Sequence, residues 1–128
     1  MDQLTSSEKV WNRACMKAGG SALRVGDKAL AAMIYFHGLA MNGGVLHALE
    51  CCNDSEISSA INGFGFYGFM SIKIMIEDNI HLIGSDDCLE EEDNRLNNEY
   101  EAAIERDQVL VDRFEKHFKD NPDQYASI

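Results

Sequence analysis

The sequence has a single proline, few basic residues and no long hydrophobic run. Proline removes a backbone hydrogen-bond donor and breaks helix interiors, so a chain whose only proline is Pro122 is free to form long helices. The longest uninterrupted apolar run, Ala29 to Phe36, is far too short to cross a bilayer. We therefore expect helices and no membrane-spanning segment.

Cysteine is also scarce and unevenly spaced. Cys51 and Cys52 are adjacent, and Cys15 and Cys88 lie far from both. Small secreted domains rely on regular disulfide frameworks, and no signal peptide opens this sequence. We expect reduced thiols and a cytoplasmic protein.

Basic residues are outnumbered two to one. Lys and Arg total 11 against 22 Asp and Glu, which gives a formal net charge of -11 and a sequence pI of about 4.6. Such a chain repels nucleic acid and anionic membranes and attracts basic proteins. The charge therefore predicts a basic protein partner, with no nucleic-acid or membrane partner.

The apolar residues have helical spacing over most of the chain. The spacing predicts an all-α fold, a single compact multi-helix domain over residues 1–128, with its core in residues 6–84 and an acidic amphipathic helical segment in residues 85–120. A helix from an Asp27 N-cap to Met41 is apolar almost all round, so we expect it to be central.

A sharp corner is predicted at Asn42, Gly43 and Gly44, where that helix meets a second apolar run beginning at Val45. Asparagine and glycine tolerate positive φ, and paired glycines let two backbones approach closely. We expect the corner to be structural and to be buried against a helix over residues 70–83, whose polar residues gather on one side at helical spacing.

A stretch rich in glycine and aromatic residues occupies residues 61–69. It contains the dinucleotide-binding pattern G-x-G-x-x-G at Gly63, Gly65 and Gly68. That pattern needs a preceding strand, whereas residues 56–62 have a helical pattern. We therefore predict a close helix junction and no nucleotide or other cofactor.

One pair of residues has the spacing of metal ligands. His47 and Cys51 stand four residues apart on one helix face, and Cys15, His81 or Cys88 would have to complete the ligand set. No Cys-x-x-Cys pair is present, and no serine lies in a glycine-flanked nucleophile elbow. We predict no metal site, no catalytic residue and no enzymatic activity.

The last third of the chain is strongly acidic. From Ser85 to the C-terminus there are 14 acidic residues and 5 basic ones, a net charge of -9. Apolar residues recur there about every 3.5 positions, which indicates an amphipathic segment with an acidic outer face. The carboxylates expected to bind the partner are Glu90, Glu91, Glu92, Asp93, Glu99, Glu101, Glu105 and Asp112.

A single helix over residues 86–119 would be too long for the domain. It would extend about 51 Å, whereas a domain of this size has a radius of gyration of about 14 Å. We expect a break at Asp93–Asn94 or Asn97–Asn98, where helix propensity is poorest. Alternatively, a second copy of the chain covers the overhang in a homodimer.

The Asn-Gly-Gly corner at residues 42–44 and the later stretch from Ile61 to Gly68 resemble the bacterial DNA-mimic protein family, over roughly residues 29–84. The resemblance implies a small, acidic, all-helical protein, sometimes dimeric, that occupies a DNA-binding protein in place of DNA. It implies no catalytic residues.

Two classes of function fit such a chain. The first is an acidic inhibitor that binds and blocks a basic protein, either as an immunity protein against a nucleic-acid-targeting toxin or as a DNA mimic. The second is a structural helical module whose acidity keeps it soluble. Because the charge is concentrated in one segment, we favour the inhibitor. One net charge per roughly 6 Å of helix is sparse beside one per about 1.7 Å in duplex DNA, which favours immunity over mimicry.

Overall fold

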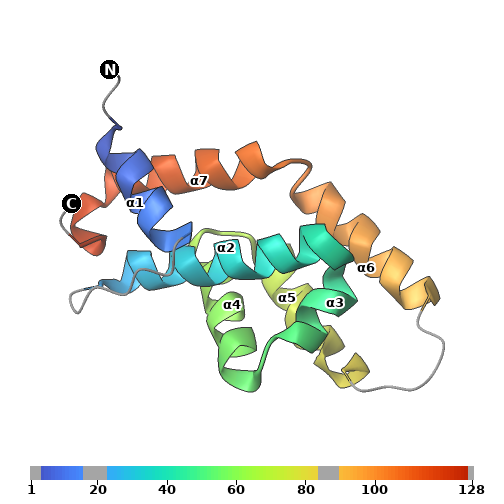
Figure 1. Ribbon diagram of the computed structural model, residues 1–128. Helices are drawn as coiled ribbons and strands as arrows, with labels where there is room; N and C mark the ends of the chain where they lie inside the picture. Colours follow the sequence, from blue (N-terminus) through green and yellow to red (C-terminus); the bar gives the residue numbers. More distant parts are fainter. Residues whose placement is uncertain (1–3, 16–22, 84–89, 127–128) are drawn as a thin grey trace.

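The computed structural model describes residues 4–15, 23–83 and 90–126. These residues form seven α-helices and two short 3₁₀ helices and contain no β-strand, so the predicted all-α fold is confirmed (Figure 1). The helices are α1 (Ser6–Cys15), α2 (Val25–Gly43), α3 (Val45–Cys51), α4 (Asp54–Phe66), α5 (Met70–Asn79), α6 (Glu90–Ala103) and α7 (Asp107–Asp120), with the 3₁₀ helices η1 (Ile80–Leu82) and η2 (Pro122–Gln124).

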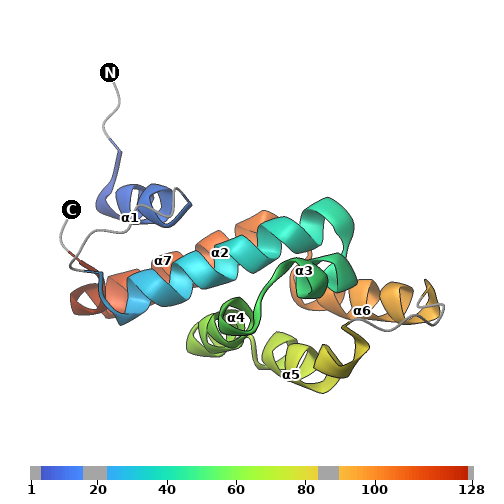
Figure 2. The ribbon, with the colours of Figure 1, turned by 60° about the horizontal axis from the view of Figure 1, so that its bottom comes forward.

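Helix α2 is central, as its apolar surface predicts. It packs against α3 and α4 on one side and against α1 on the other, and α7 runs along the same side as α1 (Figures 1 and 2). Its start differs from the prediction, because the helix begins at Val25 and Asp27 is its third residue rather than its N-cap. The Asp27 carboxylate accepts a hydrogen bond from the backbone N–H of Arg24 at 3.0 Å, and so caps the helix from inside its first turn.

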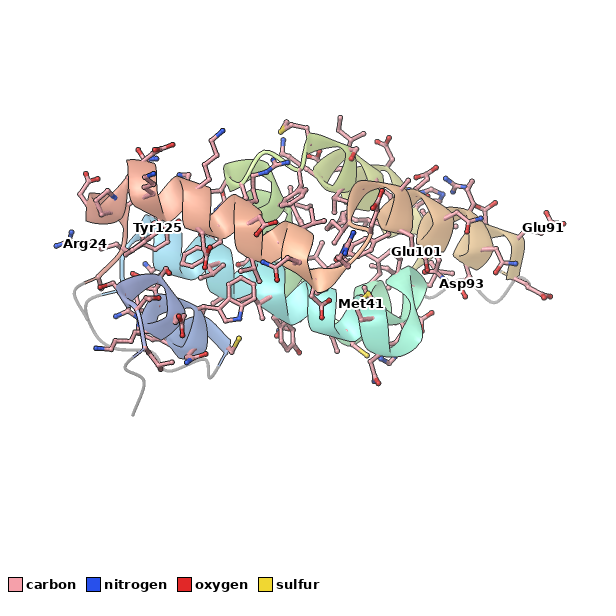
Figure 3. All side chains as sticks on the ribbon, turned by 90° about the horizontal axis from the view of Figure 1, so that it is seen from above. Arg24, Met41, Glu91, Asp93, Glu101 and Tyr125 are labelled. Carbon is pink, nitrogen blue, oxygen red and sulfur yellow. The ribbon has the colours of Figure 1, made fainter. Side chains whose placement is uncertain are left out.

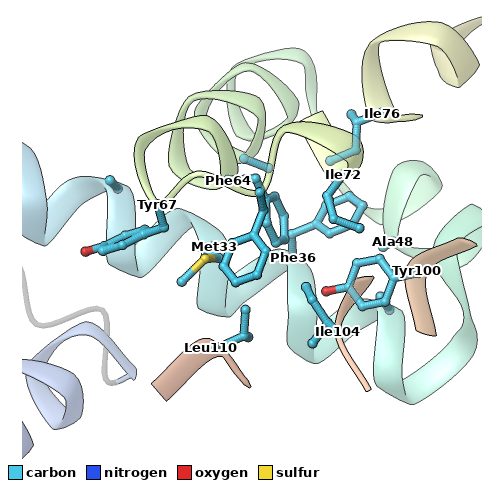
Figure 4. Close-up of a cluster of buried hydrophobic side chains, with 14 of the residues drawn as sticks. Met33, Phe36, Ala48, Phe64, Tyr67, Ile72, Ile76, Tyr100, Ile104 and Leu110 are labelled. Atoms are coloured by element: carbon cyan, nitrogen blue, oxygen red, sulfur yellow. The ribbon is translucent and has the colours of Figure 1, made fainter. Parts of the chain in front are cut away.

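The buried core is built around aromatic rings. Phe36 and Phe64 meet edge to face with their ring centroids 5.7 Å apart, and the ring of Tyr100 lies 6.3 Å from Phe64 (Figure 4). The buried residues of the C-terminal third are Leu96, Tyr100, Ile104, Leu110, Phe114 and Tyr125. The core therefore extends well beyond residue 84, and the acidic segment is part of it rather than an addition to it.

Helices α2 and α4 touch backbone to backbone at Gly63. A Cβ placed on Gly63 would lie 2.6 Å from the carbonyl oxygen of Ala29, which no real side chain tolerates. Helix α4 runs through Gly65 to Phe66, and Gly68 follows it with φ of +82°. The glycine-rich stretch is thus a close helix junction, as predicted, and a helix precedes it where a nucleotide-binding fold would have a strand.

Asparagine side chains mark the start of α4 and the end of α5. Asn53 caps α4 by accepting a hydrogen bond from the backbone N–H of Glu56 at 2.8 Å, and the Glu56 carboxylate accepts from the Asn53 N–H in return. The helix predicted over residues 70–83 is present but ends at Asn79, whose side-chain amide donates to the Met75 carbonyl at 2.7 Å. The chain continues as η1.

Candidate protein-binding surface

The acidic segment is broken after Ala103, between α6 and α7, and not at either predicted position. Asp93–Asn94 and Asn97–Asn98 both lie inside α6. Leu96 and Tyr100 are buried on the inner side of that helix and hold its middle turns against the core. Packing therefore overrides the poor helix propensity of asparagine. The break lets α6 and α7 each cover the core instead of overhanging it.

Helix α6 docks on the glycine corner. The Asn97 side-chain oxygen accepts a hydrogen bond from the backbone N–H of Val45 at 2.9 Å, and so satisfies a free donor in the first turn of α3. Gly44 has φ of +96°, as the predicted corner requires, whereas Asn42 and Gly43 are exposed in the last turn of α2. The expectation that the corner is buried against residues 70–83 is wrong, because α6 lies beside it.

Replacing Gly44 with Ala should lower the free energy of unfolding by about 1–3 kcal/mol, because φ of +96° with ψ of 170° is open essentially to glycine alone. An added Cβ would also lie 3.2 Å from the side chains of Asn97 and Asp93. Chemical denaturation measures the loss. Asn42→Ala, in the same corner, is the control and should change stability by less than about 0.5 kcal/mol. Equal stability of the two variants would contradict a conformational constraint at Gly44.

A buried histidine fixes the start of α7. Nδ1 of His37, in α2, lies 2.7 Å from the Tyr100 hydroxyl, and Nε2 lies 2.7 Å from the Asp107 carboxylate. In a neutral ring Nε2–H donates to the carboxylate and Nδ1 accepts from the hydroxyl. Burial, and then the charge of Asp107, raise the pKa of Tyr100, which keeps the hydroxyl protonated. The sequence marks His37 only as a histidine in an apolar helix, and no local pattern links it to Asp107, 70 residues later.

Four of the eight predicted partner-binding carboxylates make contacts within the chain. Glu92 and Glu99 pair with the Arg95 guanidinium at 2.6 and 3.3 Å. Asp93 and Asp112 each accept a hydrogen bond from an amide side chain in their own helix, at 3.3 and 2.8 Å. Any partner that binds these four must compete with contacts already made.

The other four predicted carboxylates are Glu90, Glu91, Glu101 and Glu105, which we call the acidic face. All four are exposed, and none forms an ion pair within the part of the chain that the structure describes. Figure 3 shows Glu91 at the N-terminal end of α6 and Glu101 further along the same helix. The acidic face therefore spans α6 from its first residue to the link with α7.

The acidic surface continues from α6 onto α3. A shallow hollow of about 390 Å³ lies between the two helices and is lined by Gly43, Leu46, His47, Glu50, Glu90 and Asp93. Glu50 was not among the predicted binding residues. His47 also lies 3.6 Å from the Cys51 sulfur, but among the described residues no three His, Cys, Asp or Glu side chains are arranged to hold a metal ion.

Comparison with known proteins found no match to a protein-family model, a curated protein or a solved structure. The resemblance to the DNA-mimic family therefore stays a prediction. None of the helices in the described ranges has both the length and the apolar composition needed to span a membrane.

Proposed function

We propose that the protein is a non-enzymatic cytoplasmic inhibitor that binds and blocks one basic protein through the acidic face. The favoured form is an immunity protein that neutralises a toxin acting on nucleic acid. A nucleic-acid-binding toxin presents a basic surface, and an acidic inhibitor complements it.

The observation that supports the proposal is the firm attachment of α6, which bears most of the acidic face. Its inner side is buried through Leu96 and Tyr100, and Asn97 ties it to the corner before α3. The His37–Asp107 contact fixes the chain just after it. A charged surface held in place before binding loses less backbone entropy on association than a flexible acidic tail would.

The charge spacing favours an immunity protein over a DNA mimic. Helix α6 has six carboxylates and one guanidinium, a net charge of -5 over 14 residues. At 1.5 Å per residue that is one net charge per about 4 Å, against one per about 1.7 Å of duplex DNA. A toxin contact needs only local complementarity and a few well-placed anchors.

The charge-reversal variant Glu91→Lys/Glu101→Lys/Glu105→Lys tests the proposal. We expect it to fold normally, since all three side chains are exposed, and to associate with the partner at least about 10-fold more slowly at low salt. Its association should also depend less on salt concentration. The partner is first captured from lysate at two salt concentrations, and the rates are then measured by surface plasmon resonance.

The matched control reverses Glu115, Asp120 and Asp123, which lie in the second half of α7 and in η2. Both triple variants change the net charge by the same amount, so a difference between them reports position rather than total charge. If the acidic-face variant binds every captured partner as fast and with the same salt dependence as the parent, the proposal is wrong.

The reading frame adjacent to the gene separates the two forms of inhibitor. A toxin domain there would favour the immunity protein, and a DNA-binding regulator would favour mimicry.

A further inference from the structure

A second surface hollow lies between α5 and α6, which Figures 1 and 2 show beside each other. Its volume is about 340 Å³, and its lining residues are Ser71, Ile72, Met75, Glu99, Ala102 and Ala103. Apart from Glu99 and Ser71 the lining is apolar. We call this hollow the α5–α6 groove.

Exposed apolar side chains gather next to the groove. Of the seven large apolar residues exposed in the described part of the chain, four come from residues 70–83. Met70 and Ile74 are about half exposed, at 49% and 51%. Residues three or four apart are neighbours on a helix surface, so Ile74 adjoins both Met70 and the groove residue Ser71. Exposed apolar side chains therefore lie on the outer side of α5, separated from the groove floor by Ser71 and Asp78.

Carboxylates border the same surface. Glu99 lines the groove on α6, and Asp78, which is exposed on α5, follows the groove residue Met75 by three positions. Arg95 closes one end by donating a hydrogen bond to the Asn79 side chain at 3.0 Å. Glu99 also pairs with Arg95 at 3.3 Å, so Asp78 is the carboxylate beside the apolar floor that forms no ion pair among the described residues.

We propose that the α5–α6 groove binds an amphipathic, Lys/Arg-rich helix of the basic partner, with that helix's apolar side on the groove floor and a cation beside Asp78. Helix-in-groove binding suits this surface because the described chain offers no strand edge that could pair with an extended peptide. This inference rests on the proposed function, since it specifies how the basic partner docks.

Charge complementarity favours a basic partner helix over a second copy of this chain. A second copy would bring another formal net charge of -11 to the interface. Like charges facing each other across an interface cost free energy and reduce association. A helix with Lys or Arg beside its apolar stripe meets the opposite charge at Asp78, whereas its cations would have to compete with Arg95 for Glu99.

The test uses a fluorescein-labelled 14-residue peptide of leucine and lysine whose leucines lie on one helix face. A peptide of the same composition with scrambled order is the first control. We expect the patterned peptide to bind at least about 10-fold more tightly than the scrambled one, as measured by fluorescence anisotropy. In the protein, Ser71→Trp and Ala102→Trp each fill the groove with an uncharged ring and should weaken binding of the patterned peptide by about 10-fold. Ser58→Trp, exposed on α4, should leave it unchanged.

Two results would overturn the groove proposal. The first is equal binding of both peptides, or unchanged binding by the two groove variants, which would mean that charge alone drives association. The second is a parent dimer, seen by analytical ultracentrifugation, that is lost in Ala102→Trp, since the occupant would then be a second copy. The charge-reversal variant of the acidic face separates the two proposals. If it loses the captured partner while Ala102→Trp retains it, the inhibitor function stands and only the groove assignment fails.

Discussion

Gly63→Ala is expected to destabilise the protein by about 2–3 kcal/mol, although alanine is the better helix former. A Cβ at this position would lie 2.6 Å from the Ala29 carbonyl oxygen and 3.3 Å from the Met33 backbone nitrogen. Both are main-chain atoms of α2 and cannot move aside as a side chain would. Helices α2 and α4 would have to separate, which loosens the contact between Phe36 and Phe64. Overpacking of this kind typically costs about 1–3 kcal/mol.

Gly38→Ala is the matched control and should have the opposite sign. Gly38 is exposed in the interior of α2, and an added Cβ meets nothing within 4 Å. Removing the backbone freedom of a mid-helix glycine should stabilise the protein by about 0.5–1 kcal/mol. Urea denaturation followed by circular dichroism measures both variants. If both substitutions stabilise the protein, the close contact between α2 and α4 does not require glycine at position 63.

The sequence predicts well those features that depend on neighbouring residues. Alternating large and small side chains identified the close junction at Gly63, and the apolar surface of the helix ending near Met41 identified the central element. The glycine pair identified the corner before α3. Each of these signals lies within one turn or one helix face, where spacing alone determines which side chains meet.

The sequence predicts poorly those features that depend on residues far apart in the chain. Asn97 was expected at a helix break because of its poor propensity, yet it lies inside α6 and binds the backbone of Val45, 52 residues earlier. His37 meets Asp107 across 70 positions. No periodicity marks such pairs, because they form only when separate helices are brought together. The positions of the acidic side chains were predicted, but which of them pair with Arg95 was not.

The other large effect is expected at Asp27, whose carboxylate is almost fully buried at 4% exposure. One oxygen accepts from the Arg13 guanidinium at 2.5 Å, and the other accepts from the backbone N–H groups of Arg24 and Ala126. It thereby joins α1, the start of α2 and the end of the described chain. Nearby, the Tyr125 hydroxyl lies 2.9 Å from that of Tyr67, and burial raises the pKa of Tyr125 to about 12.

Asp27→Ala should therefore cost about 3–5 kcal/mol, because it removes the carboxylate from a buried ion pair and leaves two backbone donors without this acceptor. Asp27→Asn should cost less, since its amide oxygen can still accept from Arg24 and Ala126, while its NH₂ group faces Arg13 as one donor facing another. Asp112→Ala, exposed on α7, is the control and should change stability by less than about 0.5 kcal/mol.

Thermal unfolding should give the lowest melting temperature for Asp27→Ala, a higher one for Asp27→Asn and a nearly unchanged one for Asp112→Ala. Asp27→Ala should melt roughly 10 °C or more below the parent. Hydrogen exchange adds a local readout, because loss of the Asp27 contacts should raise exchange at Ala126 and in the first turn of α2 before the core opens. If Asp27→Ala melts at the same temperature as the parent, and its amide exchange at Ala126 and in the first turn of α2 is no faster, the buried carboxylate does not hold the two ends of the described chain together.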